Sequence, residues 1–266
     1  SGVSSGTGLS VGTAAEVDGT ANSNPQGIVY DSNENKIVVV FQDAAASYSG
    51  AAAVGTVSGT SISFGTPVTF DADTIYYAVA CFDSSNNKVV IAYADTGNSS
   101  YLTAIVGTVS GTSISYGSPV VVESSNAADY KGIAYDANAQ KVVIGWRDAG
   151  NSNYGSAIVG TVSGTSISFG TKAAFNSAAA NVYGVTYDAN AQKVVFSYRD
   201  DGTGSGYGRS IVGTVSGTGI SFGSATTFDA NSYSNNISSG YDSTNNKVIV
   251  VFRDQGNSNY GTARVG

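Results

Sequence analysis

The chain has 266 residues and carries 12 basic against 19 acidic residues, which gives a net charge of −7 and a sequence pI of about 4.4. This balance excludes the basic footprint on which nucleic-acid binding depends. The sequence has no His and a single Cys, which excludes histidine-based catalysis, thiolate zinc sites and intrachain disulfides. No apolar run approaches the roughly 20 residues of a membrane span, so we expect no membrane insertion.

One phrase, close to VGTVSGTSISFG, recurs along the chain. The glycine that opens its GTVSGT core returns at spacings of 52, 53 and 53 residues, at Gly55, Gly107, Gly160 and Gly213. A divergent copy, GVSSGTGLSVGT, begins at Gly2, and a further step of 53 residues from Gly213 reaches the last residue, Gly266. We therefore predict a single domain over 1–266, built from five repeats at approximately 2–54, 55–106, 107–159, 160–212 and 213–266.

Each repeat shows the period-two pattern of β-strands separated by turn residues. In chain order the first complete copy predicts a strand over Gly27–Asp31, a second over Lys36–Asp43, a third of the type AAAVGTV and a fourth of the type SISFGTPVTF. Helix is nearly absent by pattern, because Gly and β-branched residues interrupt every helical stripe.

The last residue of the chain is equivalent to its second. This indicates a ring of repeats in which the two ends of the chain fall within the same repeat. Five four-stranded units that close on themselves predict an all-β fold, a closed five-bladed β-propeller with four antiparallel strands in each blade of about 53 residues. The segment Leu9–Val17 would supply the outer strand of the C-terminal blade and so close the ring. An open β-solenoid is the alternative, and it would show atypical capping repeats at its ends.

Two sets of recurring acids follow the first and second strands. The first set has two interpretations, Asx-turns or a ring of oxygen ligands for Ca²⁺, and we favour the turns: Asp31, Asp83, Asp136, Asp188 and Asp242. The second set opens the loops that follow the second strands, such as DTGNSSY, at the end of the propeller that we call the upper face. These loops are either tight turns or ligand loops, and their acids are Asp43, Asp95, Asp148, Asp200 and Asp254. From this set we include Asp95, Asp148 and Asp254 among the candidate ligand-binding residues.

Aromatic residues fall into two classes. One class recurs at a fixed position of the second strand and predicts core packing between blades: Phe41, Tyr93, Trp146, Tyr198 and Phe252. The other class stands in the divergent linkers of the upper face, where no core period demands it: Tyr76, Tyr77, Tyr130, Tyr183 and Tyr233. Exposed Tyr among Asn, Asp and Ser suits a carbohydrate site, since a flat ring packs on a sugar and polar groups bind its hydroxyls. The other interpretation is that these tyrosines pack between neighbouring blades.

The phrases YDSNENKIVVVF, GNSNYGTA and IVGTVSGTSISFG resemble the repeats of hypothetical structural and tail-associated proteins of marine bacteriophages, across all five copies. This resemblance implies an adhesion setting at the virion or cell surface. The closed plan is also similar to that of tachylectin-2-type lectins, although their sequence motifs are not matched. The Asp-box of sialidase propellers is missing.

These observations predict a non-catalytic recognition propeller that binds glycans or cell-surface polysaccharide through upper-face loops, outside the cell or on a virion, as a monomeric domain. We expect it to be no enzyme and to need no cofactor or metal ion. The alternatives are a structural spacer of a fibre or adhesin and, less favoured, a glycoside hydrolase with a carboxylate pair in the channel.

Overall fold

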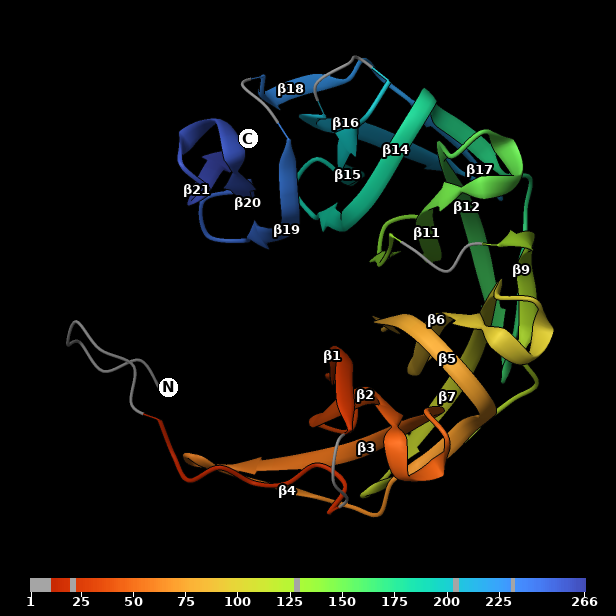
Figure 1. Cartoon of the computed structure of the whole chain (residues 1–266). Coiled ribbons are helices and arrows are strands. Elements are labelled where there is room, and N and C mark those ends of the chain that lie inside the picture. The colour runs from red at the N-terminus through yellow and green to blue at the C-terminus, as the bar shows by residue number, and fades with distance from the viewer. Residues whose placement is uncertain (1–10, 20–22, 127–129, 203–205, 231–232) are drawn as a thin grey trace.

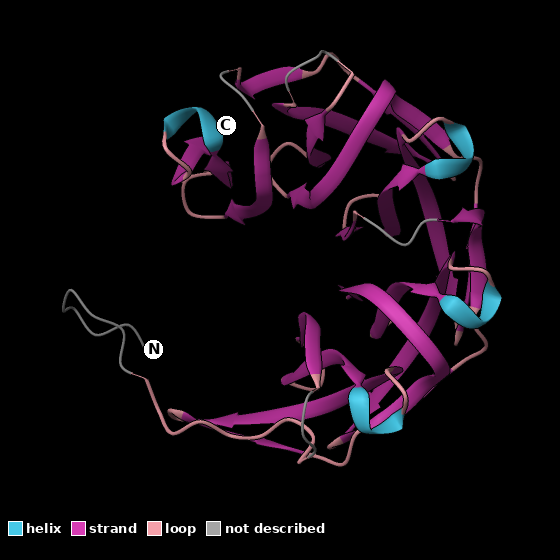
Figure 2. Cartoon of the chain, in the orientation of Figure 1, coloured by secondary structure: helices cyan, strands magenta, loops and turns pink. Residues whose placement is uncertain are grey.

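The computed structural model describes residues 11–19, 23–126, 130–202, 206–230 and 233–266 of the chain. Strands dominate this part of the chain (Figure 2) and pair antiparallel in each sheet, which confirms the prediction of an all-β fold. No helix within these described ranges is both long enough and apolar enough to cross a membrane.

The first two repeats form two successive sheets, which we call units 1 and 2. In unit 1 the order from first to outer strand is β1–β2–β3, with the outer position shared by β4 and the start of β5. The end of β5 then opens unit 2, followed by β6, β7 and an outer pair, β8 and β9. The bounds are β1 (Asn24–Asp31), β2 (Lys36–Asp43), β3 (Ser49–Ser58), β4 (Ser61–Phe64), β5 (Val68–Asp83), β6 (Lys88–Asp95), β7 (Tyr101–Ser110), β8 (Ser113–Tyr116) and β9 (Val120–Asn126).

Units 3 and 4 repeat this plan, and unit 5 has three strands. The long strand β14 links units 3 and 4 as β5 links units 1 and 2. The bounds are β10 (Lys131–Asp136), β11 (Lys141–Asp148), β12 (Tyr154–Ser163), β13 (Ser166–Phe169), β14 (Ala173–Asp188), β15 (Lys193–Asp200), β16 (Tyr207–Ser216), β17 (Gly219–Phe222), β18 (Thr226–Asp229), β19 (Ser234–Asp242), β20 (Lys247–Asp254) and β21 (Tyr260–Val265).

The fourth strand of each complete unit is broken into two pieces, whereas the sequence suggested one continuous strand. In unit 1 the register runs from Gly55 opposite Phe64 to Ala52 opposite Val68, so residues 65–67 have no partner in the ladder. Gly65 still donates its backbone N–H to the Val54 carbonyl at 2.9 Å. The break does not depend on Pro67, because it recurs in units 3 and 4, where Lys172 and Ala225 take the place of the proline.

The first acid set forms Asx-turns, as we favoured. Asp31 accepts backbone N–H groups from Asn33 and Glu34 at 2.9 and 3.0 Å, and the other four acids accept equivalent bonds. After the second set the chain makes single 3₁₀ turns in four units: η1 (Ala44–Ala46), η2 (Thr96–Asn98), η3 (Ala149–Asn151) and η4 (Gln255–Asn257). These turns are the helical segments in Figure 2.

The core lies within and between the units. The recurring second-strand aromatics are buried, which confirms their predicted role: Phe41, Tyr93, Trp146, Tyr198 and Phe252. Phe70 on the outer strand of unit 1 packs edge-on against Tyr93 of unit 2, with ring centroids 5.1 Å apart. Cys81 is buried as well, and burial raises the pKa of its thiol.

The five units follow one another around an arc (Figure 1). Successive first strands touch in the order β1, β5, β10, β14 and β19. Residues from the first strands of all five units line one central cavity of about 220 Å³. The first strands of the five units therefore face a common cavity.

The arc is open between unit 5 and unit 1 (Figure 1), so a closed ring is not observed. In the described chain β21 pairs with β20 alone. The predicted closing strand Leu9–Val17 is not formed over residues 11–17, which lie against unit 1 without strand structure; Leu9 and Ser10 fall outside the described residues. The closed ring therefore stays a prediction.

Candidate functional site

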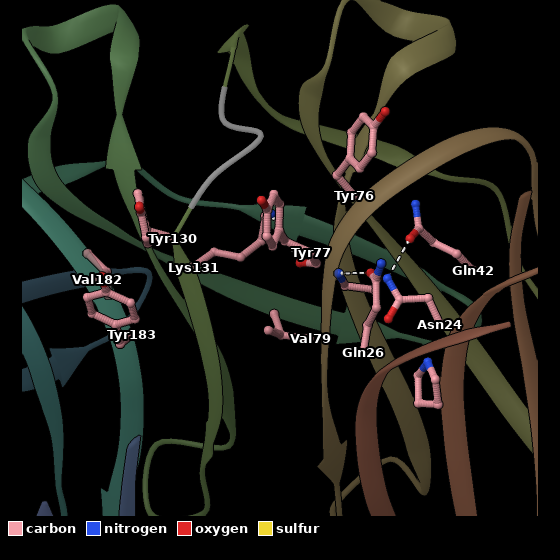
Figure 3. Close-up of a pocket in the computed structure, with 12 residues that line it drawn as sticks. Asn24, Gln26, Gln42, Tyr76, Tyr77, Val79, Tyr130, Lys131, Val182 and Tyr183 are labelled. Carbon is pink, nitrogen blue, oxygen red and sulfur yellow. Dashed lines mark hydrogen bonds between the residues drawn. The ribbon is translucent and has the colours of Figure 1, made fainter. Parts of the chain in front are cut away.

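The upper end of the channel holds a cavity of about 590 Å³. Four of the five predicted tyrosines line it, Tyr76, Tyr77, Tyr130 and Tyr183. Tyr76 and Tyr77 lie in β5, Tyr130 directly precedes β10, and Tyr183 lies in β14. Figure 3 shows the amide side chains of unit 1 on one side of this space and Tyr130 and Tyr183 on the other, with Tyr77 between them. A cavity of this size accommodates a small ligand such as one or two sugar rings.

The tyrosine rings are held by the backbone and by one another. Tyr130 and Tyr183 meet edge to face with centroids 5.1 Å apart, and Tyr76 lies 6.3 Å from Tyr77. Tyr77 and Tyr130 both have positive φ angles, 49° and 44°. Such angles are costly for a side chain with a Cβ and concentrate at functional sites. Asn236, three repeats after Tyr77, has a similar φ of 51°, and positive φ recurs in the turns of every unit, so these angles belong to the repeated backbone of the fold.

Polar groups from unit 1 complete the wall. Asn24 donates from Nδ2 to Gln42 Oε1 at 2.9 Å, and Gln42 in turn donates from Nε2 to the Ile75 carbonyl. Gln26 accepts the Ala78 N–H at 2.5 Å (Figure 3). These bonds fix three amide side chains across the seam between units 1 and 2. Fixed amides beside aromatic rings are the groups that orient a sugar hydroxyl.

Two cations stand beside the tyrosines. Lys131, which is only 5% exposed, donates from Nζ to the Tyr77 carbonyl at 3.1 Å and lies 5.5 Å from the centre of that ring. The guanidinium of Arg147 lies 5.9 Å from the centre of the Tyr130 ring. Both contacts are of the cation–π type and hold each ring from one face.

A third cation extends this arrangement toward unit 5. Arg199 stacks on Tyr233 at 5.2 Å and forms an ion pair with Asp201, with Nε 2.7 Å from Oδ1. Burial raises the pKa of the Tyr183 hydroxyl to about 12, against the opposing effect of Arg199. This hydroxyl is therefore protonated at neutral pH and can donate a hydrogen bond. Tyr233, the fifth predicted tyrosine, does not line the cavity.

The predicted acids lie apart from the cavity and serve local structure. Asp95 and Asp254 cap the turns η2 and η4 by accepting the N–H of the third residue on. Asp148 makes no such cap; it accepts from Ser156 at 3.2 Å and pairs with Lys172 at 3.0 Å. The structure thus brings four predicted tyrosines together and leaves Asp95, Asp148 and Asp254 outside that group.

One acidic cluster could hold a metal ion among the residues that the structure describes. Asp71, Asp73 and Asp95 each offer an oxygen, all within 4.8 Å of one another. Burial and then the neighbouring Asp71 and Asp73 raise the pKa of Asp95, partly offset by its backbone hydrogen bonds. In unit 4 the equivalent of Asp95 is Asp200, which forms an ion pair with Arg209, with Nη1 3.2 Å from Oδ2. The cluster lies outside the cavity.

Comparison with known proteins shows similarity of fold. No protein-family model and no curated protein matches the chain. The SapL1 lectin, solved with α-methyl fucoside, aligns with a TM-score of 0.56 at 14% identity, covering 90% of this chain and 75% of the lectin. An exo-β-1,3-galactanase from Phanerochaete chrysosporium, solved with galactotriose, aligns with a TM-score of 0.54 at 11% identity, covering 96% of this chain and 62% of the enzyme. At such identities the alignments establish a shared all-β fold.

The sequence did not indicate the polar members of the site. Asn24, Gln26 and Gln42 sit in stretches that look like ordinary turn and strand residues. Lys131 carried a signal, because it is the one cation in the five divergent linkers.

Proposed function

We propose that this protein is a non-catalytic carbohydrate-binding protein with its site at the upper mouth of the channel. The observation that carries this proposal is the convergence of four tyrosines and three amide side chains on one cavity. Tyrosine faces pack against the apolar face of a sugar ring, and the amides bind its hydroxyls. The site is central and shared by units 1 to 4.

A hydrolase is the less favoured alternative. Glycoside hydrolysis needs two carboxyl groups roughly 5 to 9.5 Å apart, flanking the scissile bond. Among the described residues that line the cavity, none is an Asp or a Glu. This composition supports binding without catalysis, although one structural neighbour is a galactanase.

We also propose that the ring is closed by the chain's own N-terminal segment. An added Cβ at Gly12 would lie 1.8 Å from the Thr60 carbonyl, and the equivalent positions in the next three repeats make the same approach at 1.9 to 2.0 Å, at Gly65, Gly117 and Gly170. Val17 packs on the cluster that contains Phe41, as its equivalent Phe70 packs on Tyr93. Residues 11–17 thus follow the path of an outer strand.

The matching groove lies between units 4 and 5. It measures about 590 Å³ and is lined by apolar residues that include Phe228, Val248 and Val250. In unit 4 the equivalent space is filled by Phe222, whose ring lies 5.5 Å from Phe175 and 5.6 Å from Phe196. The repeat makes Val11 the counterpart of Phe222, and Val11 is 81% exposed. Seating this segment in the groove would bury it and close the fifth blade.

The virion or cell-surface setting implied by the repeat's resemblance fits this proposal. Several copies of one weak site on a fibre or particle give avidity toward a repetitive glycan surface. A monomeric domain with a single site would then be one unit of a multivalent display.

A glycan array probed with the whole chain tests the function. We expect binding that falls about 30-fold, or about 2 kcal/mol, in Tyr130→Ala, because an aromatic anchor at the centre of a site contributes on this scale. Tyr30→Ala is the matched control, since Tyr30 is half-exposed and lies outside the cavity. No binding to any glycan at high protein concentration would refute the proposal and favour a structural spacer.

A further inference from the structure

Three carboxylates gather at the seam between units 1 and 2, where the outer strand of one unit meets the second strand of the next. Asp71 and Asp73 lie near the start of β5, and Asp95 ends β6. One oxygen of each acid lies within 4.8 Å of the other two. No ion pair of the described chain includes any of the three. Like charges this close disfavour one another's ionised state, so the cluster favours a cation.

The next seam, between units 2 and 3, shows a cation held by the equivalent acids. Glu123 and Asp148 are the equivalents of Asp71 and Asp95. The ammonium of Lys172 forms ion pairs with both of them, with its Nζ 3.0 Å from Asp148 Oδ2. At this seam a lysine therefore offsets the charge of the two facing acids.

The seam between units 3 and 4 is neutralised in another way. Asn176 replaces the first acid and donates to Asp200 Oδ1 at 3.2 Å, while Arg209 pairs with Oδ2 of the same acid at 3.2 Å. Unit 2 carries neither cation, because Pro119 and Thr103 stand at the positions of the lysine and the arginine. A cation from solution would supply the charge that this seam lacks.

The third acid is particular to the seam between units 1 and 2. Asp73 lies against Gly97 of the η2 turn, and Ser125 and Ala178 lie against the equivalent glycines at the next two seams. The fold therefore accepts a neutral residue at this place. A carboxylate that adds repulsion here is explained by a ligand that needs it.

A buried hydroxyl faces the cluster from the core. Tyr93 is fully buried, and its Oη has no hydrogen-bond partner among the described residues. Burial, and then the nearby carboxylates of Asp71 and Asp95, raise the pKa of this hydroxyl, so it is a neutral donor beside Asp71. The carboxylates are less buried than Tyr93, so an ion would contact them and not the hydroxyl. A donor behind a ligating carboxylate orients that carboxylate toward the metal.

We propose that Asp71, Asp73 and Asp95 bind a calcium ion that joins unit 1 to unit 2. Calcium takes about six to eight oxygen ligands at about 2.3 to 2.6 Å in flexible geometry, and carboxylates, backbone carbonyls and water all serve. Oxygens within 4.8 Å of one another can share one ion at such distances. The ion would do at this seam what Lys172 does at the next one.

Thermal unfolding of the whole chain, first treated with a chelator and then titrated with calcium chloride, tests the proposal. We expect the melting temperature to rise with calcium and to fall again with chelator, because a ligand of the native state stabilises it. Titration calorimetry should give one site with a Kd on the order of 10⁻⁴ to 10⁻³ M, since the cluster is partly exposed. Asp73→Asn removes one ligand charge and should weaken binding about tenfold or more.

Two further variants sharpen this test. Pro119→Lys copies Lys172 of unit 3, so it should raise the melting temperature without calcium and abolish the further rise that calcium gives. Asp188→Asn is the control, because it makes the same change of charge in a turn outside the cluster and should keep the calcium response.

Three results would overturn the calcium site. They are a melting temperature that calcium does not raise, an equal rise with sodium chloride at the same ionic strength, which would reflect screening alone, and a calcium response that survives in Asp73→Asn. Because the cluster lies outside the tyrosine-lined cavity, each of these results leaves the carbohydrate-binding proposal standing.

Discussion

A variant with Ala15→Cys and Ala263→Cys should form a disulfide within one chain under mild oxidation. In the four units that have an outer strand, the equivalent residues face each other directly: Ala52 and Val68, Ala104 and Val120, Ala157 and Ala173, and Ser210 and Thr226. Antiparallel partners have Cα atoms about 4.5 to 5.5 Å apart, which suits a disulfide. The crosslink would join nearly the whole chain into one loop, for which chain entropy predicts about 5 kcal/mol of stabilisation and a raised melting temperature.

Register provides the control for this experiment. Glu16→Cys with Ala263→Cys shifts the pair by one residue and points the thiol to the other face of the strand, so it should crosslink poorly. The native Cys81 is buried and its pKa is raised, so its thiol stays out of exchange. Cysteines that remain reduced in the matched pair, or that link separate chains, would contradict closure by the chain's own N-terminal segment.

The second large effect is expected at Gly155, where a leucine should cost about 3 kcal/mol. An added Cβ at Gly155 would lie 2.4 Å from the Phe175 ring, and Gly50 and Gly208 meet Phe70 and Phe228 in the same way. Overpacking a filled core costs on this scale. Urea unfolding with a fitted midpoint would measure the change.

Unit 2 shows how the clash is relieved. Leu102 replaces the glycine there, Val122 replaces the phenylalanine, and Val122 packs against the buried cluster that contains Leu102. Gly155→Leu combined with Phe175→Val should therefore recover about 2 kcal/mol relative to the sum of the single changes. Gly261→Leu is the control, because its counterpart on the proposed closing strand is Val17 and the pair would copy Leu102 and Val122. A double variant no better than the sum would contradict this account of the core.

Local features of the fold could be predicted because their causes are local. The glycine spacing predicted five sheet units, and the Asx-turns at Asp31 and its equivalents follow from a side chain that reaches backbone two residues on. The burial of Trp146 and its counterparts follows from their fixed place on the second strand. The outer strand was predicted as one piece, because the break at residues 65–67 depends on pairing that the pattern alone does not reveal.

The site could be predicted in part. Tyr76, Tyr77, Tyr130 and Tyr183 were identified because no core period explained them, yet their meeting in one cavity depends on how the units curve around the channel. That curvature arises from packing between units that are about 50 residues apart in sequence, so no local motif encodes it. Asp148 shows the same limit: its partner Lys172 comes from the outer strand region of the same unit, and Asp148 makes this pair in place of the cap that Asp95 and Asp254 form.

The stoichiometry of sugar binding tests the central claim most directly. Titration calorimetry with the strongest binder from the array should give one site per chain, and Tyr183→Ala should weaken that site without changing the number. A stoichiometry of several sugars per chain, unaffected by Tyr183→Ala, would contradict a single tyrosine-lined site at the mouth of the channel.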